Sequence, residues 1–462
     1  MALTLDATGL FGDGQDARLT RANFGAELSR GARARDLHLA ETPAWRTLHA
    51  RPEYLAACQK RADEVRSRQA PEVFVVLGIG GSALGNQALI AALAPIYQEW
   101  QSASGRPRLF VLDNVDPDWL GEFFDNLPAG RMHVNVISKS GGTIETSAQF
   151  LLAWDRIRRA CASDAEARER FTLTTDPSGG HFRVLADQFG FATLPVPAGV
   201  GGRFSVLSPV GLFTAAMGGF DCASLLEGAA KTDARLRATQ PDQDPALAWA
   251  LAHVLYLERG KPNHVHFVYS HRARLLAEWW QQLWAESLGK KRTTDGRPAR
   301  FGPTPVTALG PTDQHSQIQL YAEGPDDKVY TFLKIDKFGR GLDVPPAFAP
   351  SPAFAPLASR SFQELMQAER EGTEIALEQA GRPVCRIELC QLDAFHVGAY
   401  FLFCEVATAI AGHLLDVNPY DQPGVEAGKL NALALMSAPG FESQGALLRG
   451  AIAQRKAVRL SC

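Results

Sequence analysis

The sequence lacks an excess of charge of either sign, and it lacks a regular cysteine pattern. Its 462 residues include 47 Lys and Arg against 50 Asp and Glu. The formal net charge of −3 gives no sign of a nucleic-acid or membrane partner. The cysteines are odd in number and scattered, without a CxxC pair, which favours reduced thiols in a cytoplasm over disulfides or a zinc site. They are Cys58, Cys161, Cys222, Cys385, Cys390, Cys404 and Cys462.

The chain also has little that resembles a signal peptide or a membrane span. Its first residues contain Asp6, Asp13 and Asp16 where a signal peptide has basic and apolar regions, so we expect a cytoplasmic protein. The most apolar run, residues 397–417, carries Glu405 and His413. We therefore predict that it is a buried core helix.

The length predicts more than one domain, because 462 residues exceed what a single hydrophobic core usually supports. The polar, proline-containing stretch 238–245 is the best linker candidate. We expect a helical segment over residues 1–70, domains over 71–236 and 246–435, and a helical tail over 436–462. Apolar strand patterns alternate with helical ones, which predicts the α/β class with doubly wound, mainly parallel sheets.

A strand predicted over residues 132–137 ends in a loop rich in hydroxyl groups, and helical spacing follows it. The loop contains Ser138, Lys139, Ser140 and Thr143 together with two glycines. Free backbone N–H groups and the dipole at the start of a helix attract anions, and hydroxyls and a lysine add donors. One interpretation is a phosphate-binding loop, and the other is an ordinary helix cap with turn residues.

A glycine-rich loop follows another predicted strand, at residues 73–77. It fits the G-x-G-x-x-G/A dinucleotide fingerprint through Gly78, Gly80 and Ala83. Asp113 could then bind a ribose, which makes a nicotinamide dehydrogenase an alternative. Against this alternative, Asp113 lies about thirty residues past the glycines, whereas the fingerprint places its acidic residue about twenty residues past them. Ser82 suits a sugar or a monophosphate as well. We expect both loops to reach one carboxyl edge of the sheet, where open α/β sheets bind ligands.

Further candidates lie downstream, and each also has a plain structural interpretation. Arg203 stands in a glycine-rich turn, and it could equally be a solvated residue at a helix start. Glu286 ends a helix predicted over residues 272–288, either as a general base or as a solvated last-turn residue. His315 is either an acid–base group or a polar helix-start residue. Gln422 and Lys429 belong to a Pro/Gly turn that could line a site or cap a surface helix.

Taken together, these segments resemble the glucose-6-phosphate (phosphoglucose) isomerase family in its shorter bacterial form. The resemblance covers most of the chain, about residues 70 to 435, with the motifs in the family's order. The most specific are GGRFSVLSPVGL at 201–212 and GHLLDVNPYDQPGVEAGK at 412–429, and GIGGSALG, SKSGGT, AESLGK and DQHSQ agree with them. The resemblance implies two sugar-isomerase domains, each a mainly parallel sheet flanked by helices, and an obligate homodimer.

The resemblance also implies roles for the candidate residues. The sugar phosphate would be held by Ser138, Lys139, Ser140 and Thr143, with Gly81 and Ser82 close by. Glu286 would be the base that moves a proton between C1 and C2 through a cis-enediol. His315, supplied by the partner subunit, and Lys429 would assist ring opening, and Arg203 and Gln422 would lie beside the reacting carbons. The Gly141–Gly142 pair departs from animal members toward the bacterial pattern.

The implied reaction is the reversible conversion of glucose 6-phosphate to fructose 6-phosphate in glycolysis and gluconeogenesis. An aldose–ketose isomerase needs a base, an acid and a cation near the enediolate, and it needs neither a metal nor a redox cofactor. Consistent with this, the sequence has no metal-ligand spacing such as HExxH. A phosphosugar-sensing module is a further alternative, but such regulators usually carry a basic DNA-binding segment, and none is visible.

Overall fold

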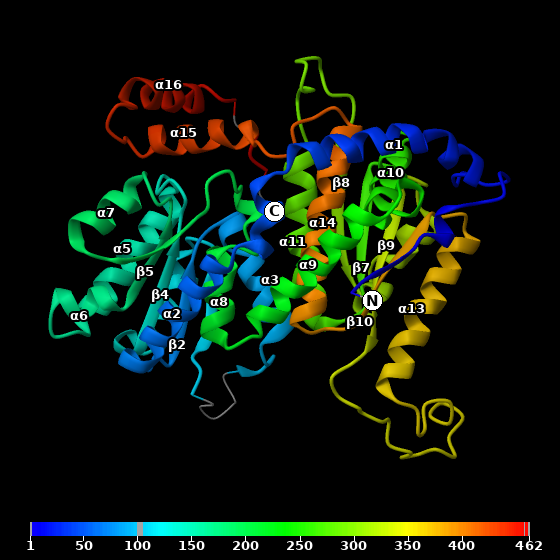
Figure 1. Ribbon diagram of the computed structural model, residues 1–462, viewed down its shortest axis with the longest axis horizontal. Helices are drawn as coiled ribbons and strands as arrows, with labels where there is room; N and C mark the ends of the chain where they lie inside the picture. Colours follow the sequence, from blue (N-terminus) through cyan, green and yellow to red (C-terminus); the bar gives the residue numbers. More distant parts are fainter. Residues whose placement is uncertain (1, 99–104, 457, 461–462) are drawn as a thin grey trace. The chain divides into compact units, whose positions relative to one another are not determined.

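The computed structural model describes residues 2–98, 105–456 and 458–460. Cys462, one of the seven cysteines, lies outside the described residues. The chain divides into two compact units, Met1–Pro419 and Tyr420–Cys462. Both β-sheets of the described chain belong to the larger unit (Figure 1).

The first sheet is five-stranded and parallel, with the order β3-β2-β4-β5-β6. Its strands are β2 (Val73–Leu77), β3 (Arg108–Leu112), β4 (Met132–Ile137), β5 (Phe171–Thr175) and β6 (Ala192–Pro195). Three of them, β2, β4 and β5, are buried along their whole length, because helices cover both faces of the sheet. Strand β2 is accordingly a continuous apolar run, whereas β4 and β5 also bury polar side chains that bond to each other, as Thr174 Oγ1 donates to Asn135 Oδ1 at 2.7 Å.

Side chains of successive residues in β2 point to opposite faces and meet different helices. Val73, Val75 and Leu77 pack in one cluster with α4 (Pro117–Asn126), α5 (Ile144–Arg159) and α7 (His181–Phe189). Phe74 points the other way, where its ring meets Phe213 edge-on at 5.4 Å. Phe213 belongs to α8 (Pro209–Gly218), which packs beside α2 (Pro52–Gln69) and α3 (Leu84–Leu93). The predicted doubly wound arrangement is confirmed.

The second sheet has the order β1-β10-β9-β7-β8, and all of its strands except β1 run parallel. The strands are β1 (Thr4–Asp6), β7 (Asn263–Val268), β8 (Thr304–Leu309), β9 (Lys328–Lys337) and β10 (Val384–Gln391). Strand β1 corrects the expectation that residues 1–70 are entirely helical. It pairs antiparallel with the open edge of β10, where an ion pair of 2.8 Å joins Asp6 to Arg386. An edge strand offers unpaired backbone groups that a distant segment can satisfy.

Apolar helices lie between the two sheets (Figure 1). At their centre is α14 (Ala394–Leu414), which packs against α1 (Arg21–Glu41), α9 (Cys222–Ala238), α10 (Pro245–Glu258) and α11 (Arg274–Leu288). The helix is long and apolar enough to cross a membrane, but 94% of its most apolar window is buried inside the fold. The prediction of a core helix at this position is confirmed. Contacts between α3 and α11 join the two halves of the unit.

Two predicted boundaries differ from the structure. The stretch 238–245 is a tight connection, because the buried Arg35 binds its ends through Asp244 at 2.6 Å and the carbonyl of Thr239 at 2.7 Å. Residues 436–462 are not a separate tail either. Helix α16 (Glu442–Ala453) packs on α15 (Glu426–Leu435), so the smaller unit begins at Tyr420. The remaining helices of the larger unit are α6 (Asp164–Glu169), α12 (Ile318–Glu323) and α13 (Phe362–Gln379).

Candidate active site

Two glycine loops touch at the carboxyl edge of the first sheet. One is the 3₁₀ turn Gly80–Ser82 after β2, and the other is the 3₁₀ turn Gly202–Phe204. A Cβ atom built on Gly81 would lie 2.2 Å from the carbonyl carbon of Gly202 and 2.4 Å from the backbone nitrogen of Arg203. Only glycine permits this approach. The contact sets the position of Arg203 relative to the loop.

Arg203 is buried, with 2% of its side chain exposed, and its guanidinium is held on three sides. Its Nε donates to Ser287 Oγ at 2.7 Å, and its Nη2 donates to the carbonyl of Pro419 at 2.6 Å. The third nitrogen, Nη1, lies 3.6 Å from Glu286 Oε1. A planar guanidinium bound at two points cannot swing, so it presents a positive charge of fixed position beside the carboxylate.

Glu286 occupies the last turn of α11, and 24% of its side chain is exposed. Arg203 faces one carboxylate oxygen, while Gln282 Nε2 donates to the other, Oε2, at 3.1 Å. The carboxylate is therefore oriented from both sides yet open to a ligand, unlike a freely solvated last-turn residue. Neither Gln282 nor Ser287 was predicted from the sequence. The i,i+4 spacing of Gln282 from Glu286 on a helix was the signal that could have found it.

The hydroxyl-rich loop lies between β4 and α5. Ser138 is buried, and its Oγ accepts a hydrogen bond from the N–H of Gly141 at 3.1 Å, as Ser140 Oγ does from Gly142. Thr143 stands at the N-cap of α5, but its side chain makes no capping bond. Lys139 is exposed, and its ammonium donates to the carbonyl of Val200 at 3.3 Å. That bond ties the loop to the segment that leads into Arg203.

The two loops leave neighbouring strands, as predicted. Strand β2 pairs in parallel with β4, with Leu77 opposite Val136. The chain order reverses between these two strands, because β3 lies on one side of β2 and β4 on the other. In doubly wound sheets this reversal opens a crevice at the carboxyl edge, and ligands bind there.

The other predicted residues lie elsewhere on the chain. His315 ends the 3₁₀ turn Thr312–His315 after β8, where its side chain is exposed and makes no hydrogen bond or ion pair within the described part of the chain. Gln422 and Lys429 belong to the smaller unit, where Lys429 pairs with Glu426 at 3.1 Å. Asp113 accepts a hydrogen bond from Gln87 at 3.0 Å.

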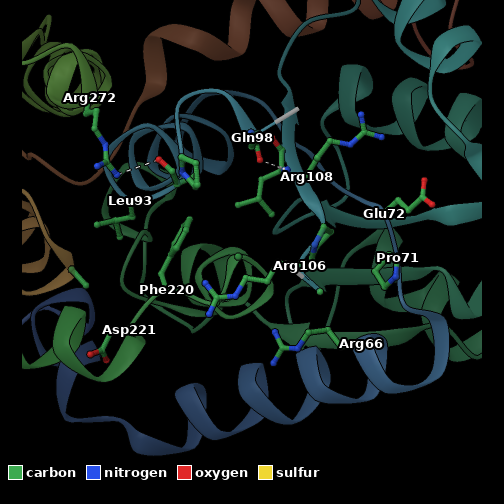
Figure 2. A pocket seen from close by; sticks show the side chains of 18 of the residues that line it. Arg66, Pro71, Glu72, Leu93, Gln98, Arg106, Arg108, Phe220, Asp221 and Arg272 are labelled. Carbon is green, nitrogen blue, oxygen red and sulfur yellow. Dashed lines mark hydrogen bonds between the residues drawn. The ribbon is translucent and has the colours of Figure 1, made fainter. Parts of the chain in front are cut away.

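A cavity of about 910 Å³ opens at the opposite, amino edge of the first sheet (Figure 2). Glu72 and Arg108, at the starts of β2 and β3, line it together with Arg66, Arg106 and Arg272. None of the predicted site residues lines this cavity. Its size alone therefore does not make it the candidate active site, which is argued from the loops and from the pair formed by Arg203 and Glu286.

Two mainly parallel sheets flanked by helices, with a hydroxyl-rich loop at the strand-order reversal, place the chain in the sugar-isomerase class of fold. Comparison with known proteins agrees. The structure superposes on a glucose-6-phosphate isomerase from Chlamydia trachomatis with a TM-score of 0.80 and 22% identity, covering 94% of this chain and 90% of that one. It superposes on a hypothetical protein from Thermus thermophilus with a TM-score of 0.83 and 33% identity, covering 94% and 100%.

The sequence comparisons identify the family. Residues 64–338 match the phosphoglucose isomerase family. A glucose-6-phosphate isomerase from Rubrobacter xylanophilus is 41% identical over 88% of this chain and 91% of that relative. The chain belongs to the phosphoglucose isomerase family and is an aldose–ketose isomerase. The resemblance read from the motifs is confirmed, and the dehydrogenase alternative is set aside.

Proposed function

We propose that this enzyme interconverts glucose 6-phosphate and fructose 6-phosphate, as a cytoplasmic homodimer acting in glycolysis and gluconeogenesis. The observation that carries the proposal is the pairing of Glu286 with Arg203 at 3.6 Å, beside the glycine loop at the carboxyl edge of the first sheet. The names of the relatives support the choice of substrate.

The pair supplies the two groups that the reaction needs most. Glu286 takes the proton from C2 of the open-chain aldose and returns it to C1 of the cis-enediol intermediate. While the proton is on Glu286, negative charge develops on the oxygens of the enediolate, and the Arg203 guanidinium offsets it. Because Ser287 and the carbonyl of Pro419 already hold that guanidinium, little reorganisation is needed as the charge forms. The isomerisation is redox-neutral overall, so the chemistry requires no hydride carrier.

We assign the sugar phosphate to the loop before α5. Ser138, Lys139, Ser140 and Thr143 would bind the phosphate oxygens, with Gly81 and Ser82 at the adjoining loop. The N-terminus of a 16-residue helix favours an anion through its free N–H groups and its dipole. The unused capping capacity of Thr143 supports this assignment, because its hydroxyl is available to a ligand.

The remaining assignments extend beyond one subunit and beyond the larger unit. His315 would enter the site of the partner subunit and, with Lys429, assist ring opening, while Gln422 would lie near the reacting carbons. The exposure of His315 supports a role at a subunit interface. In this proposal the first half of the larger unit carries the phosphate loop, its second half carries Glu286 and His315, and the smaller unit carries Lys429.

The proposal is tested by replacing the carboxylate of Glu286 with an amide. Glu286→Gln should lower kcat by at least about 10²–10⁴, the usual worth of a positioned base, while fructose 6-phosphate still binds by calorimetry. Turnover is followed through glucose-6-phosphate dehydrogenase. The matched control is Glu278→Gln, two turns earlier on α11, where a partly exposed carboxylate pairs only with Arg274 at 3.5 Å among the described residues. A Glu286→Gln enzyme with most of its kcat would contradict the assignment.

The wild-type enzyme tests the reaction itself. Turnover of fructose 6-phosphate supports the isomerase, whereas tight binding without turnover would favour a phosphosugar-sensing role. Sedimentation equilibrium tests the dimer. An active monomer would exclude a cross-subunit role for His315.

A further inference from the structure

Helix α1 meets the end of α14 (Figure 1), and three side chains that could bind a metal lie close together there. They are His38 and Glu41, one turn apart on α1, and His413 in the last turn of α14. One ligand atom from each lies within 4.8 Å of the other two. Because His413 lies hundreds of residues from the other two, no local spacing in the sequence indicates this cluster.

His38 gives the second, independent indication of a ligand. The residue is fully buried, and neither ring nitrogen has a hydrogen-bond partner among the residues that the structure describes. Trp45 stacks on the ring at 5.7 Å and covers a face of it, while the nitrogens lie on the edge. Buried polar atoms are normally paired, since leaving one unpaired costs free energy. A bound ion would satisfy one of these nitrogens.

Charged side chains from several segments lie around the cluster. Burial, reinforced by the positive charge of Arg46, holds the pKa of His38 well below its usual range. Asp233 pairs with Arg46 at 2.6 Å and also with Arg237 at 2.7 Å, so one carboxylate is shared between the two guanidiniums. Glu41, already 3.1 Å from His413 Nε2, supplies the negative charge that offsets a cation.

We propose that His38, Glu41 and His413 bind one divalent transition-metal ion, of which Zn²⁺ is the best fit. Two imidazole nitrogens and one carboxylate oxygen form a known three-ligand zinc set, in which water completes the coordination. Borderline nitrogen donors favour zinc over magnesium or calcium, which prefer all-oxygen sites. The carboxylate of Glu41 is partly exposed and gives the ion a route to solvent.

The ion would be structural and would support the active site indirectly. Trp45 stacks on Phe204 at 4.9 Å, and Phe204 follows Arg203 in the chain. On the other side, Pro419 lies six residues after His413, and its carbonyl accepts a hydrogen bond from Arg203. A metal that joins α1 to the end of α14 would therefore hold both segments that position the Arg203 guanidinium.

The test is metal binding by the full-length chain after treatment with EDTA. Zn²⁺ is titrated in competition with a chromophoric chelator, and we expect one equivalent per chain. His413→Gln and Glu41→Gln change partly exposed side chains and leave the core intact. Because even outer partners of a metal ligand are worth about 10–100-fold in affinity, loss of a direct ligand should weaken binding by about 100-fold or more. His271→Gln, an exposed histidine outside the cluster, should bind as the wild type does.

Two further measurements separate this site from adventitious binding. Thiols also bind zinc, so the titration is repeated with Cys390→Ser/Cys462→Ser, which should not change the affinity. Zinc should also raise the Tm of the wild type and not that of His413→Gln or Glu41→Gln. Absence of stoichiometric binding, or equal binding by the two ligand variants, would overturn the proposal. None of these readouts depends on isomerase activity.

Discussion

The contact between Gly81 and Gly202 provides a sharp test of how the two loops create the site. A methyl group on Gly81 would lie 2.2 Å from the carbonyl carbon of Gly202. Carbon atoms pack at about 3.5 Å or more, so Gly81→Ala requires the loops to separate by roughly 1.3 Å. The opposing atoms are backbone, and no change of rotamer can relieve the clash. Arg203 must move with its backbone nitrogen, 2.4 Å from the added carbon.

The expected effect is larger on catalysis than on folding. A displacement of about 1 Å in a catalytic group can cost about 10²-fold in rate, so we expect kcat/KM of Gly81→Ala to fall by about that factor. Overpacking of this kind costs about 1–3 kcal/mol of stability, which a folded enzyme usually tolerates. The rate is measured by the coupled assay, and the stability by urea unfolding of the same preparation.

A substitution at Gly202, the other residue of this contact, provides the control. A Cβ on Gly202 would lie 3.6 Å from the Cα of Gly81, which is an ordinary contact. Gly202→Ala should therefore keep nearly wild-type activity, and so should Gly121→Ala, whose Cβ would meet nothing within 4 Å. The reasoning is refuted if folded Gly81→Ala stays within a few-fold of wild-type kcat/KM, or if Gly202→Ala is impaired to the same degree.

Three more predictions concern buried charged or titratable groups. In Arg203→Lys a single ammonium group cannot bond to Ser287 Oγ, the carbonyl of Pro419 and the enediolate at the same time. We therefore expect kcat to fall by about 10²–10³, and an unchanged kcat would contradict this reasoning. Burial lowers the pKa of His253 from 6.5 to about 4, so its contribution to stability is complete above pH 6.5 and is lost as the pH falls. This residue should account for a loss of about 2 kcal/mol between pH 6.5 and 5, measured by urea unfolding as the difference between wild type and His253→Gln because the pKa values of other buried histidines are also lowered, and a difference that does not change with pH would refute the assignment. Burial raises the pKa of Glu405 well above 4.5, and neither carboxylate oxygen has a partner among the described residues. Because the folded pKa is raised, the contribution of the neutral carboxyl to stability is complete below pH 4.5 and is lost as the pH rises toward that raised value. The stability of Glu405→Gln relative to wild type should therefore be greater at pH 8 than at pH 5, and a constant difference would argue against this reasoning.

Much of the fold was predictable because local patterns and tertiary environment agree. Strand β2 is apolar over its whole length, as strands covered on both faces of a parallel sheet commonly are, and β4 and β5 are likewise buried throughout although they carry His133, Asn135 and three threonines. The edge strands β1 and β8 were missed. Strand β1 has only three residues, and Pro305 interrupts the pattern of β8 at a position that an edge strand tolerates. The pairing of β1 with β10 joins the two ends of the larger unit, which no local signal records.

The sequence by itself determined the loops, the order of the motifs and the family, because glycines, hydroxyls and a helix start carry their chemistry locally. It also identified Arg203 and Glu286 as candidates. Only the tertiary structure decided that these two side chains lie 3.6 Å apart, that Ser287 and Gln282 orient them, and that His38, Glu41 and His413 converge. The reason is physical: a side chain's position relative to a distant segment depends on how the helices pack between the sheets, and packing is a property of the whole core.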